Sequence, residues 1–196
     1  PWAYNDLGGT FQVEVNHRLA KHEDPTAAAE QAIAALAQAV RLDPDYAIGY
    51  SNIALTYSNL ARYAVESGKD PSESVRTCEE YAKKAEAIDA MNLVAAGSRE
   101  FAYLMQILYE VESGIPTEAS LHTFLASVDA ISKKFPELNI PYQHKAMALS
   151  LLAAQRAQGR QDPEPTRAEA LSAVLACQAR AQGADANCAA IAALVW

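Results

Sequence analysis

The side chains best suited to metal binding are few and poorly spaced in this 196-residue sequence. Glu14 and His17 would share one face of a helix, but they supply only two ligands, whereas structural zinc sites use about four. His17 and His22 are five residues apart, a spacing that turns them to different faces. We therefore expect no metal and no cofactor. The other histidines, expected to be ordinary surface or packing residues, are His122 and His144.

The cysteines do not indicate redox or nucleophilic chemistry. Cys78, Cys177 and Cys188 are an odd number at unrelated spacings, so they predict neither a disulfide framework nor a CxxC pair. We expect buried or half-buried thiols in a reducing compartment, and hence a cytoplasmic protein.

Short catalytic motifs are absent from the sequence. It contains no glycine-rich phosphate-binding pattern, no HExxH zinc motif and no GxSxG nucleophile elbow. Without the His-Arg-Asp and Asp-Phe-Gly motifs of protein kinases, this chain is not expected to transfer a phosphoryl group itself. We therefore predict that it is not an enzyme. Because it begins at Pro1 rather than at Met, we expect it to be a piece of a longer protein.

Composition narrows the classes of partner. Hydrophobic residues make up 51% of the chain, which is enough for a continuous core, and only 8 Gly and 9 Pro argue against low-complexity disorder. The net charge of −8 argues against a nucleic-acid or an anionic-membrane partner. No apolar run approaches the roughly 18 residues that a membrane-spanning helix needs.

A period of 46 residues organises the whole sequence. The length equals four units of 46 and a remainder of 12. Unrelated types of marker residue share this period, which chance rarely produces. The markers are Tyr4, Tyr50, Ala96 and Tyr142; Pro44, Ala90 and Pro136; His22, Gly68 and Gly114; and the Asp-Pro pairs at 24, 70 and 162, with Ile115-Pro116 as a loose equivalent.

Each unit is expected to form two helices. In the second unit, the first helix is predicted from about Asp45 to Glu66 and ends at Ser67-Gly68, where glycine can adopt the left-handed conformation. The second helix is predicted to start at Asp70-Pro71, since an aspartate caps free N–H groups and proline suits the first turn. Thr166-x-x-Glu169 predicts a capping box in the fourth unit.

The predicted fold class is all-α, because no segment shows the alternation typical of a strand. Two helices cannot bury their own apolar face, so the units should stack into one right-handed superhelical solenoid. We expect a single array over residues 1–196, with repeats at 1–46, 47–92, 93–138 and 139–184. A partial fifth repeat or a cap is expected at 185–196.

Two stretches resemble the opening of the tetratricopeptide repeat (TPR), in which an aromatic residue precedes a Leu-Gly pair and a second aromatic residue. They are Tyr4-x-x-Leu7-Gly8-x-x-Phe11 and Tyr50-x-x-Ile53-Ala54-x-x-Tyr57. The later part of the motif is matched by Ala32, Leu36, Ala39 and Pro44. In the third unit, Arg99-Glu100 replaces the Leu-Gly pair.

The unit is longer than the family's repeat of about 34 residues, and the additional residues fall between Phe11 and Ala32. Such elongated repeats resemble the arrays that follow the kinase domain in some large bacterial serine/threonine protein kinases.

The resemblance implies that the first helices line a concave surface that binds a protein or peptide. Because the implied positions include no Lys or Arg, we do not expect them to grip a terminal carboxylate. The apolar residues among them suit a hydrophobic helix or peptide. The implied positions are Asn5, Gln12, Ile48, Ser51, Leu55, Asn59, Phe101, Leu104, Met105, Gln143, Met147 and Leu151.

Three readings of function stay open. The best is a non-catalytic interaction scaffold or sensory module that docks a partner on the concave face. The alternative is the regulatory C-terminal region of a bacterial serine/threonine kinase, acting by intramolecular packing of that face or by oligomerisation. A third is self-association through the ends of the array, since residues 189–196 carry no charge.

Overall fold

The computed structural model describes residues 1–181 and Cys188. This part of the chain contains eight helices and no strand, so the all-α prediction is confirmed for it. The predicted fifth repeat or cap at 185–196 lies outside the described residues, apart from Cys188. The helices are α1 (Trp2–Ala20), α2 (Thr26–Leu42), α3 (Ala47–Glu66), α4 (Ser72–Ile88), α5 (Leu93–Glu112), α6 (Glu118–Lys134), α7 (Ile140–Gln158) and α8 (Glu164–Arg180).

The chain divides into two compact units. Unit 1 runs from Pro1 to Tyr109 and contains α1 to α4 and most of α5. Unit 2 runs from Glu110 to Trp196 and begins in the last turn of α5. Each unit has its own buried core.

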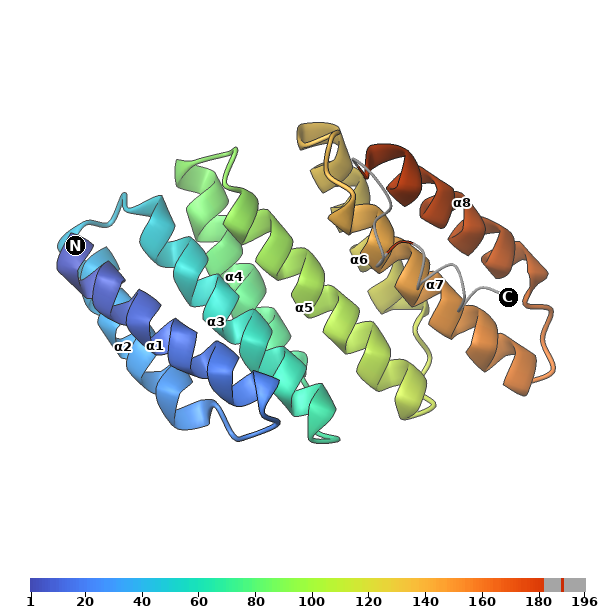
Figure 1. The fold of residues 1–196 in the computed structure, drawn as a ribbon, viewed down its shortest axis with the longest axis horizontal. Helices are drawn as coiled ribbons and strands as arrows, with labels where there is room; N and C mark the ends of the chain where they lie inside the picture. Colours follow the sequence, from blue (N-terminus) through green and yellow to red (C-terminus); the bar gives the residue numbers. More distant parts are fainter. Residues whose placement is uncertain (182–187, 189–196) are drawn as a thin grey trace. The chain divides into compact units, whose positions relative to one another are not determined.

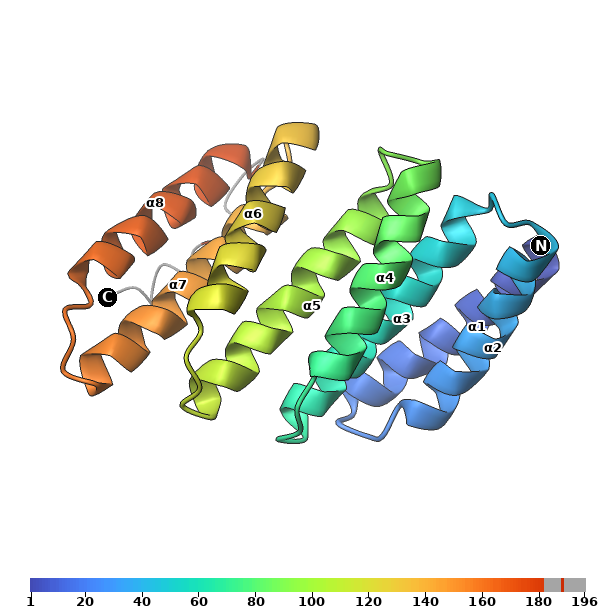
Figure 2. The ribbon, with the colours of Figure 1, turned by 180° about the vertical axis from the view of Figure 1, so that it is seen from behind.

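Unit 1 has two layers of helices. In Figure 1, α1, α3 and α5 lie side by side, and Figure 2 shows α2 and α4 covering their other side. Small side chains dominate the interface of α2, whose buried residues are five alanines and one leucine that bring neighbouring helices close together. They are Ala29, Ala32, Leu36 and Ala39 at 0% exposure, with Ala28 at 4% and Ala35 at 6%.

In unit 2, α7 packs against α8, and α6 packs against α7. The core between α7 and α8 combines small and branched side chains, with Leu121 of α6 packed against it. Phe124 of α6 is fully buried. The core residues shared by α7 and α8 are Ala146, Leu149, Ala170, Ala173 and Val174.

The period of 46 is present in the structure as well as in the sequence. The second helix of each repeat has 17 residues, and these helices begin 46 residues apart, at Thr26, Ser72, Glu118 and Glu164. Each predicted repeat therefore holds two helices, as expected.

All four first helices end in the same turn. The residue that closes each has a positive φ: His22 (56°), Gly68 (67°), Gly114 (68°) and Arg160 (58°). The next residue donates its N–H to the carbonyl five positions back, as in Lys69 N to Ala64 O at 2.7 Å. These bonds form a Schellman motif, which satisfies carbonyls that a helix end leaves free.

The starts of the second helices differ in one repeat. The carboxylates of Asp24, Asp70 and Asp162 each accept the N–H two residues later, at 2.9, 2.9 and 3.0 Å. The third repeat has Pro116 in that position and so lacks the carboxylate. The predicted capping box at Thr166 is wrong, because α8 starts earlier and Thr166 lies buried inside it.

None of the described helices is both long and apolar enough to cross a membrane.

Replacing His22 with glycine should stabilise the protein. A side chain in the left-handed region costs about 1–2 kcal/mol, and glycine avoids that cost. We expect His22→Gly to raise the free energy of unfolding in urea by about 1 kcal/mol. His22→Ala removes the same exposed imidazole but keeps Cβ, so no gain is expected. An equal gain in both variants would contradict the conformational explanation.

The α1–α2 contact can be tested with two adjacent glycines. A Cβ on Gly8 would stand 2.6 Å from Cγ of Leu36, which is fully buried and cannot move away, whereas a Cβ on Gly9 would meet nothing within 4 Å. We expect Gly8→Ala to lower the free energy of unfolding by about 1–3 kcal/mol. Gly9→Ala should raise it by about 0.5–1 kcal/mol through helix propensity. Effects of the same sign would show that the two helices are less tightly packed than described.

Candidate functional site

Several residues predicted to bind a partner form hydrogen bonds between α1 and α3. The amide of Gln12 is buried and donates to the carbonyl oxygen of Asn52 at 2.7 Å and to Oγ1 of Thr56 at 2.9 Å. Asn5 accepts a hydrogen bond from Asn52 at 2.9 Å. Asn59 donates to Asn16 at 3.2 Å. These hydrogen bonds connect the two helices. They use side chains that were predicted from the sequence to bind a ligand.

Three further predicted positions lie in the interior. Ser51 is 2% exposed, and its hydroxyl donates to the carbonyl oxygen of Ile48. Leu104 and Met105 are 1% and 6% exposed. A partner could reach these side chains only if the surrounding structure moved, so their burial does not favour a direct role in binding.

The remaining predicted positions are accessible to different degrees. In unit 1, Ile48 is 50% exposed, while Leu55 and Phe101 are half-buried. In unit 2, Gln143, Met147 and Leu151 are half-buried. Gln143 also donates to Sγ of Cys188 at 3.7 Å. Ile48 is thus the one predicted position among the described residues whose side chain is mostly open to a partner.

The aromatic residues at the start of the repeats differ in how deeply they are buried. Tyr4 is 42% exposed. Tyr50 and Tyr57 are half-buried and stack against Tyr81 of α4, with ring centroids 6.3 and 6.1 Å apart. These contacts join α3 to α4 and leave no open platform for stacking a ligand.

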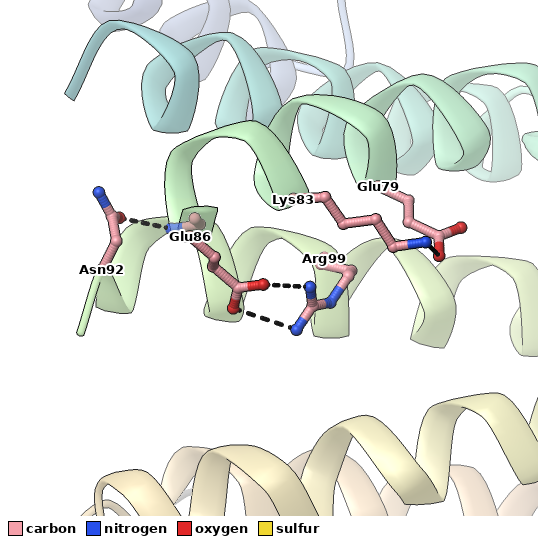
Figure 3. A network of polar contacts seen from close by, with 6 residues as sticks. Glu79, Lys83, Glu86, Asn92 and Arg99 are labelled. Carbon is pink, nitrogen blue, oxygen red and sulfur yellow. Dashed lines mark hydrogen bonds and ion pairs between the residues drawn. The ribbon is translucent and has the colours of Figure 1, made fainter. Parts of the chain in front are cut away.

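Arg99, which replaces the leucine of the repeat motif, has a structural explanation. Arg99 of α5 forms two hydrogen bonds to the carboxylate of Glu86 in α4, and both side chains are largely buried (Figure 3). A bidentate pair of this kind is geometrically specific and stronger than a neutral hydrogen bond. Lys83 and Glu79 form a second pair along α4 at 2.7 Å.

Tyr103 of α5 extends this polar contact between α4 and α5. Burial raises the pKa of the Tyr103 hydroxyl, and its hydrogen bond to Glu79 raises it further. Burial also opposes ionisation of Glu79, but hydrogen bonds from Lys83 and Tyr103 outweigh it and lower the pKa of that carboxyl. Such shifted groups can mark active sites, yet these are explained by a structural network between two helices.

The cysteines differ from the expected set of three free thiols. Cys177 of α8 and Cys188 form a disulfide, so the prediction of no disulfide is wrong. The sequence could not reveal this bond, because a separation of 11 residues between two cysteines matches no known disulfide pattern. Cys78 is free and buried, and burial raises the pKa of its thiol to about 12.

One end of unit 1 carries a group of exposed apolar side chains that sequence reasoning largely missed. At this end, α1, α3 and α5 begin and α2 and α4 finish (Figure 1). Trp2 contacts Tyr46 with ring centroids 6.1 Å apart, which links α1 to the start of α3. We call this group the end patch; it comprises Trp2 (72% exposed), Leu42 (54%), Ile48 (50%), Ile88 (40%), Met91 (57%) and Val94 (45%).

The residues of the end patch recur with the period of 46 residues. The turns at this end of unit 1 contain acidic residues. Trp2, Ile48 and Val94 are 46 residues apart, as are Leu42 and Ile88, so the period was the signal that could have found it. Its turns contain Asp43, Asp45 and Asp89. Burial raises the pKa of the Tyr46 hydroxyl, and the charges of Asp6 and Asp43 raise it further.

The described residues hold no group of three or more His, Cys, Asp or Glu side chains arranged to bind a metal ion.

No protein-family model, no curated protein and no solved structure matches this chain.

Thiol counting tests the cysteine arrangement. The neutral thiol of Cys78 is buried and is not a nucleophile at pH 8, so the native protein should show no thiol that reacts with Ellman's reagent. Denaturant without reductant should expose one thiol, and denaturant after reduction should expose three. Three thiols before reduction would show that Cys177 and Cys188 are not bonded.

Proposed function

We propose that this chain is a non-catalytic protein-interaction module that binds an amphipathic, basic helix or peptide on the end patch of unit 1. The observation that carries the proposal is the exposure of large apolar side chains at one end of unit 1, repeated with the period of the chain. Contiguous exposed apolar side chains that are surrounded by polar residues are typical of protein-interaction sites.

The proposed architecture is a right-handed superhelical array of TPR-like repeats. Four pairs of helices with a constant spacing and a constant turn between partners support it. In such an array the starts of successive first helices are neighbours, which accounts for the way the apolar side chains collect at one end. Ile48 belongs both to the positions implied by the TPR resemblance and to the end patch.

Charge favours a basic partner. Residues 1–109 contain nine basic and fifteen acidic side chains, a net charge of −6. Asp43, Asp45 and Asp89 lie beside the apolar side chains, and Arg41 is the basic residue closest in sequence. Lysines or arginines next to apolar anchors would therefore be attracted during encounter and would discriminate against acidic partners.

A pair of designed peptides tests this proposal. One helical peptide carries leucines along one face and lysines along the other, and its twin carries glutamates in place of the lysines. We expect fluorescence anisotropy to detect binding of the lysine peptide and binding at least about tenfold weaker for the glutamate peptide, which corresponds to about 1.4 kcal/mol. The double variant Ile48→Asp with Met91→Asp should abolish binding.

Val13→Asp is the matched control. Val13 is 69% exposed on α1 but lies outside the end patch, so this change adds a charge to an exposed apolar position without affecting the proposed site. Equal affinity for both peptides, or binding that survives the double variant, would refute the proposal. Sedimentation of the protein alone distinguishes self-association: a dimer that Ile48→Asp dissociates would make a second copy the occupant.

A further inference from the structure

Unit 2 contains a cleft of about 250 Å³ that the proposed function does not use. It lies between the turn that joins α5 to α6 and the end of α7 with the turn that follows it. Its lining combines two opposite charges, a hydroxyl and apolar side chains. The lining residues on which the argument depends are Ile115, Thr117, Glu118, Leu152, Gln155 and Arg156.

The two charges in the cleft are not neutralised by each other. Arg156 donates from Nη1 to Oγ1 of Thr166 at 2.5 Å, and it forms no ion pair with any described residue. Glu118, the exposed first residue of α6, lines the same cleft and forms no ion pair within the described part of the chain. A guanidinium has five N–H donors, so most of those on Arg156 remain available for a planar carboxylate.

Thr117 adds a hydroxyl beside these charges. The residue is 3% exposed and lines the cleft, and its hydroxyl forms no hydrogen bond within the described residues. The hydroxyl oxygen is not among the described side-chain atoms that are both sealed from solvent and without a partner, so a ligand in the cleft can reach it and accept its hydrogen bond.

The start of α6 has the same deficit. In the other three repeats an aspartate carboxylate accepts the first N–H of the second helix, as Asp70 does for Ser72. Here Pro116 holds that position, and Thr117 makes no side-chain cap. Free N–H groups at a helix start attract an anion. Pro116, which replaces the aspartate, lines the same cleft as Thr117 and the guanidinium of Arg156.

We propose that this cleft binds a small zwitterion of the amino-acid type with an apolar side chain. Its carboxylate would bind Arg156, with Thr117 and the start of α6 as further donors, and its ammonium would bind Glu118. Ile115 and Leu152 would contact the side chain. The volume of the cleft suits a ligand smaller than the drug-sized molecules that occupy pockets of about 300–1,000 Å³.

The choice of a zwitterion rests on the presence of both charges. A phosphate or a simple carboxylate would be attracted by Arg156 but repelled by Glu118. An amine alone would leave the donors at Arg156 and Thr117 unused. The site lies in unit 2, whereas the end patch lies in unit 1, so failure of one proposal leaves the other unaffected.

Calorimetry with four probes tests the ligand class. L-leucine carries both charges, N-acetyl-leucine lacks the ammonium, leucinamide lacks the carboxylate, and inorganic phosphate represents a simple anion. We expect leucine to bind at least about tenfold more tightly than each of the others, since a hydrogen bond to a charged group contributes about 1.5–3 kcal/mol. Equal or tighter binding of any of the other three, or no heat with leucine, would overturn the proposal.

Variants then test the residues. Arg156→Gln should weaken leucine binding at least about tenfold, and Glu118→Gln should remove the preference for leucine over N-acetyl-leucine. Arg167→Gln is the matched control, because Arg167 is a nearby arginine that pairs with Glu164 outside the cleft. Undiminished binding by folded Arg156→Gln would refute the assignment.

Because Arg156 also bonds Thr166, circular dichroism must show that its variant folds. A titration of the unaltered protein with leucine, followed by amide chemical shifts, gives an answer that depends on no variant. Shifts concentrated at residues 114–118 and 155–161 are expected, and shifts elsewhere would place the ligand in another site.

Discussion

Close approach of helices through small side chains is the constraint on which this structure depends. The contact face of α2 is built mainly of alanine and that of α8 of small residues in general, so neighbouring backbones lie near each other and little room is left for large residues. Where a large side chain does enter such an interface, the residue that it faces on the neighbouring helix is a glycine. Leu36 packs where a Cβ on Gly8 would stand, and Val40 packs where a Cβ on Gly49 would stand.

The same constraint explains why the repeats agree at some points and differ at others. The turn after each first helix must reverse the chain within a few residues, and all four repeats solve this with one left-handed residue. Two of those residues are not glycine. The left-handed backbone conformation is therefore kept even where a Cβ makes it unfavourable. The start of the second helix is under less constraint. There the third repeat departs from the aspartate cap, and the cleft with Arg156 lies beside that departure.

The helices could be predicted from sequence because their boundaries depend on local signals. Asp70 and Gly68 fix the start and the end of helices through backbone geometry alone, and the period repeats these signals. Side-chain accessibility could not be predicted in the same way. Whether Gln12 faces solvent or Thr56 depends on the rotation of α1 against α3, which no residue within α1 determines. A repeat motif therefore predicts on which face of a helix a residue lies, but it does not predict what that face contacts.

The two proposed sites differ in how their charge is arranged, and this difference follows from the repeats that build them. In unit 1, the acidic residues lie in the turns that join one repeat to the next, so their field surrounds the exposed apolar ends. In unit 2, Arg156 of α7 and Glu118 of α6 line one cleft and carry opposite charges, so the cleft offers a position for a ligand group of each sign. A surface with a net field selects partners by their overall charge, whereas a cleft with balanced charges selects by the distance between charges in the ligand. The first arrangement suits a long partner with many contacts, and the second suits a small molecule that carries both signs.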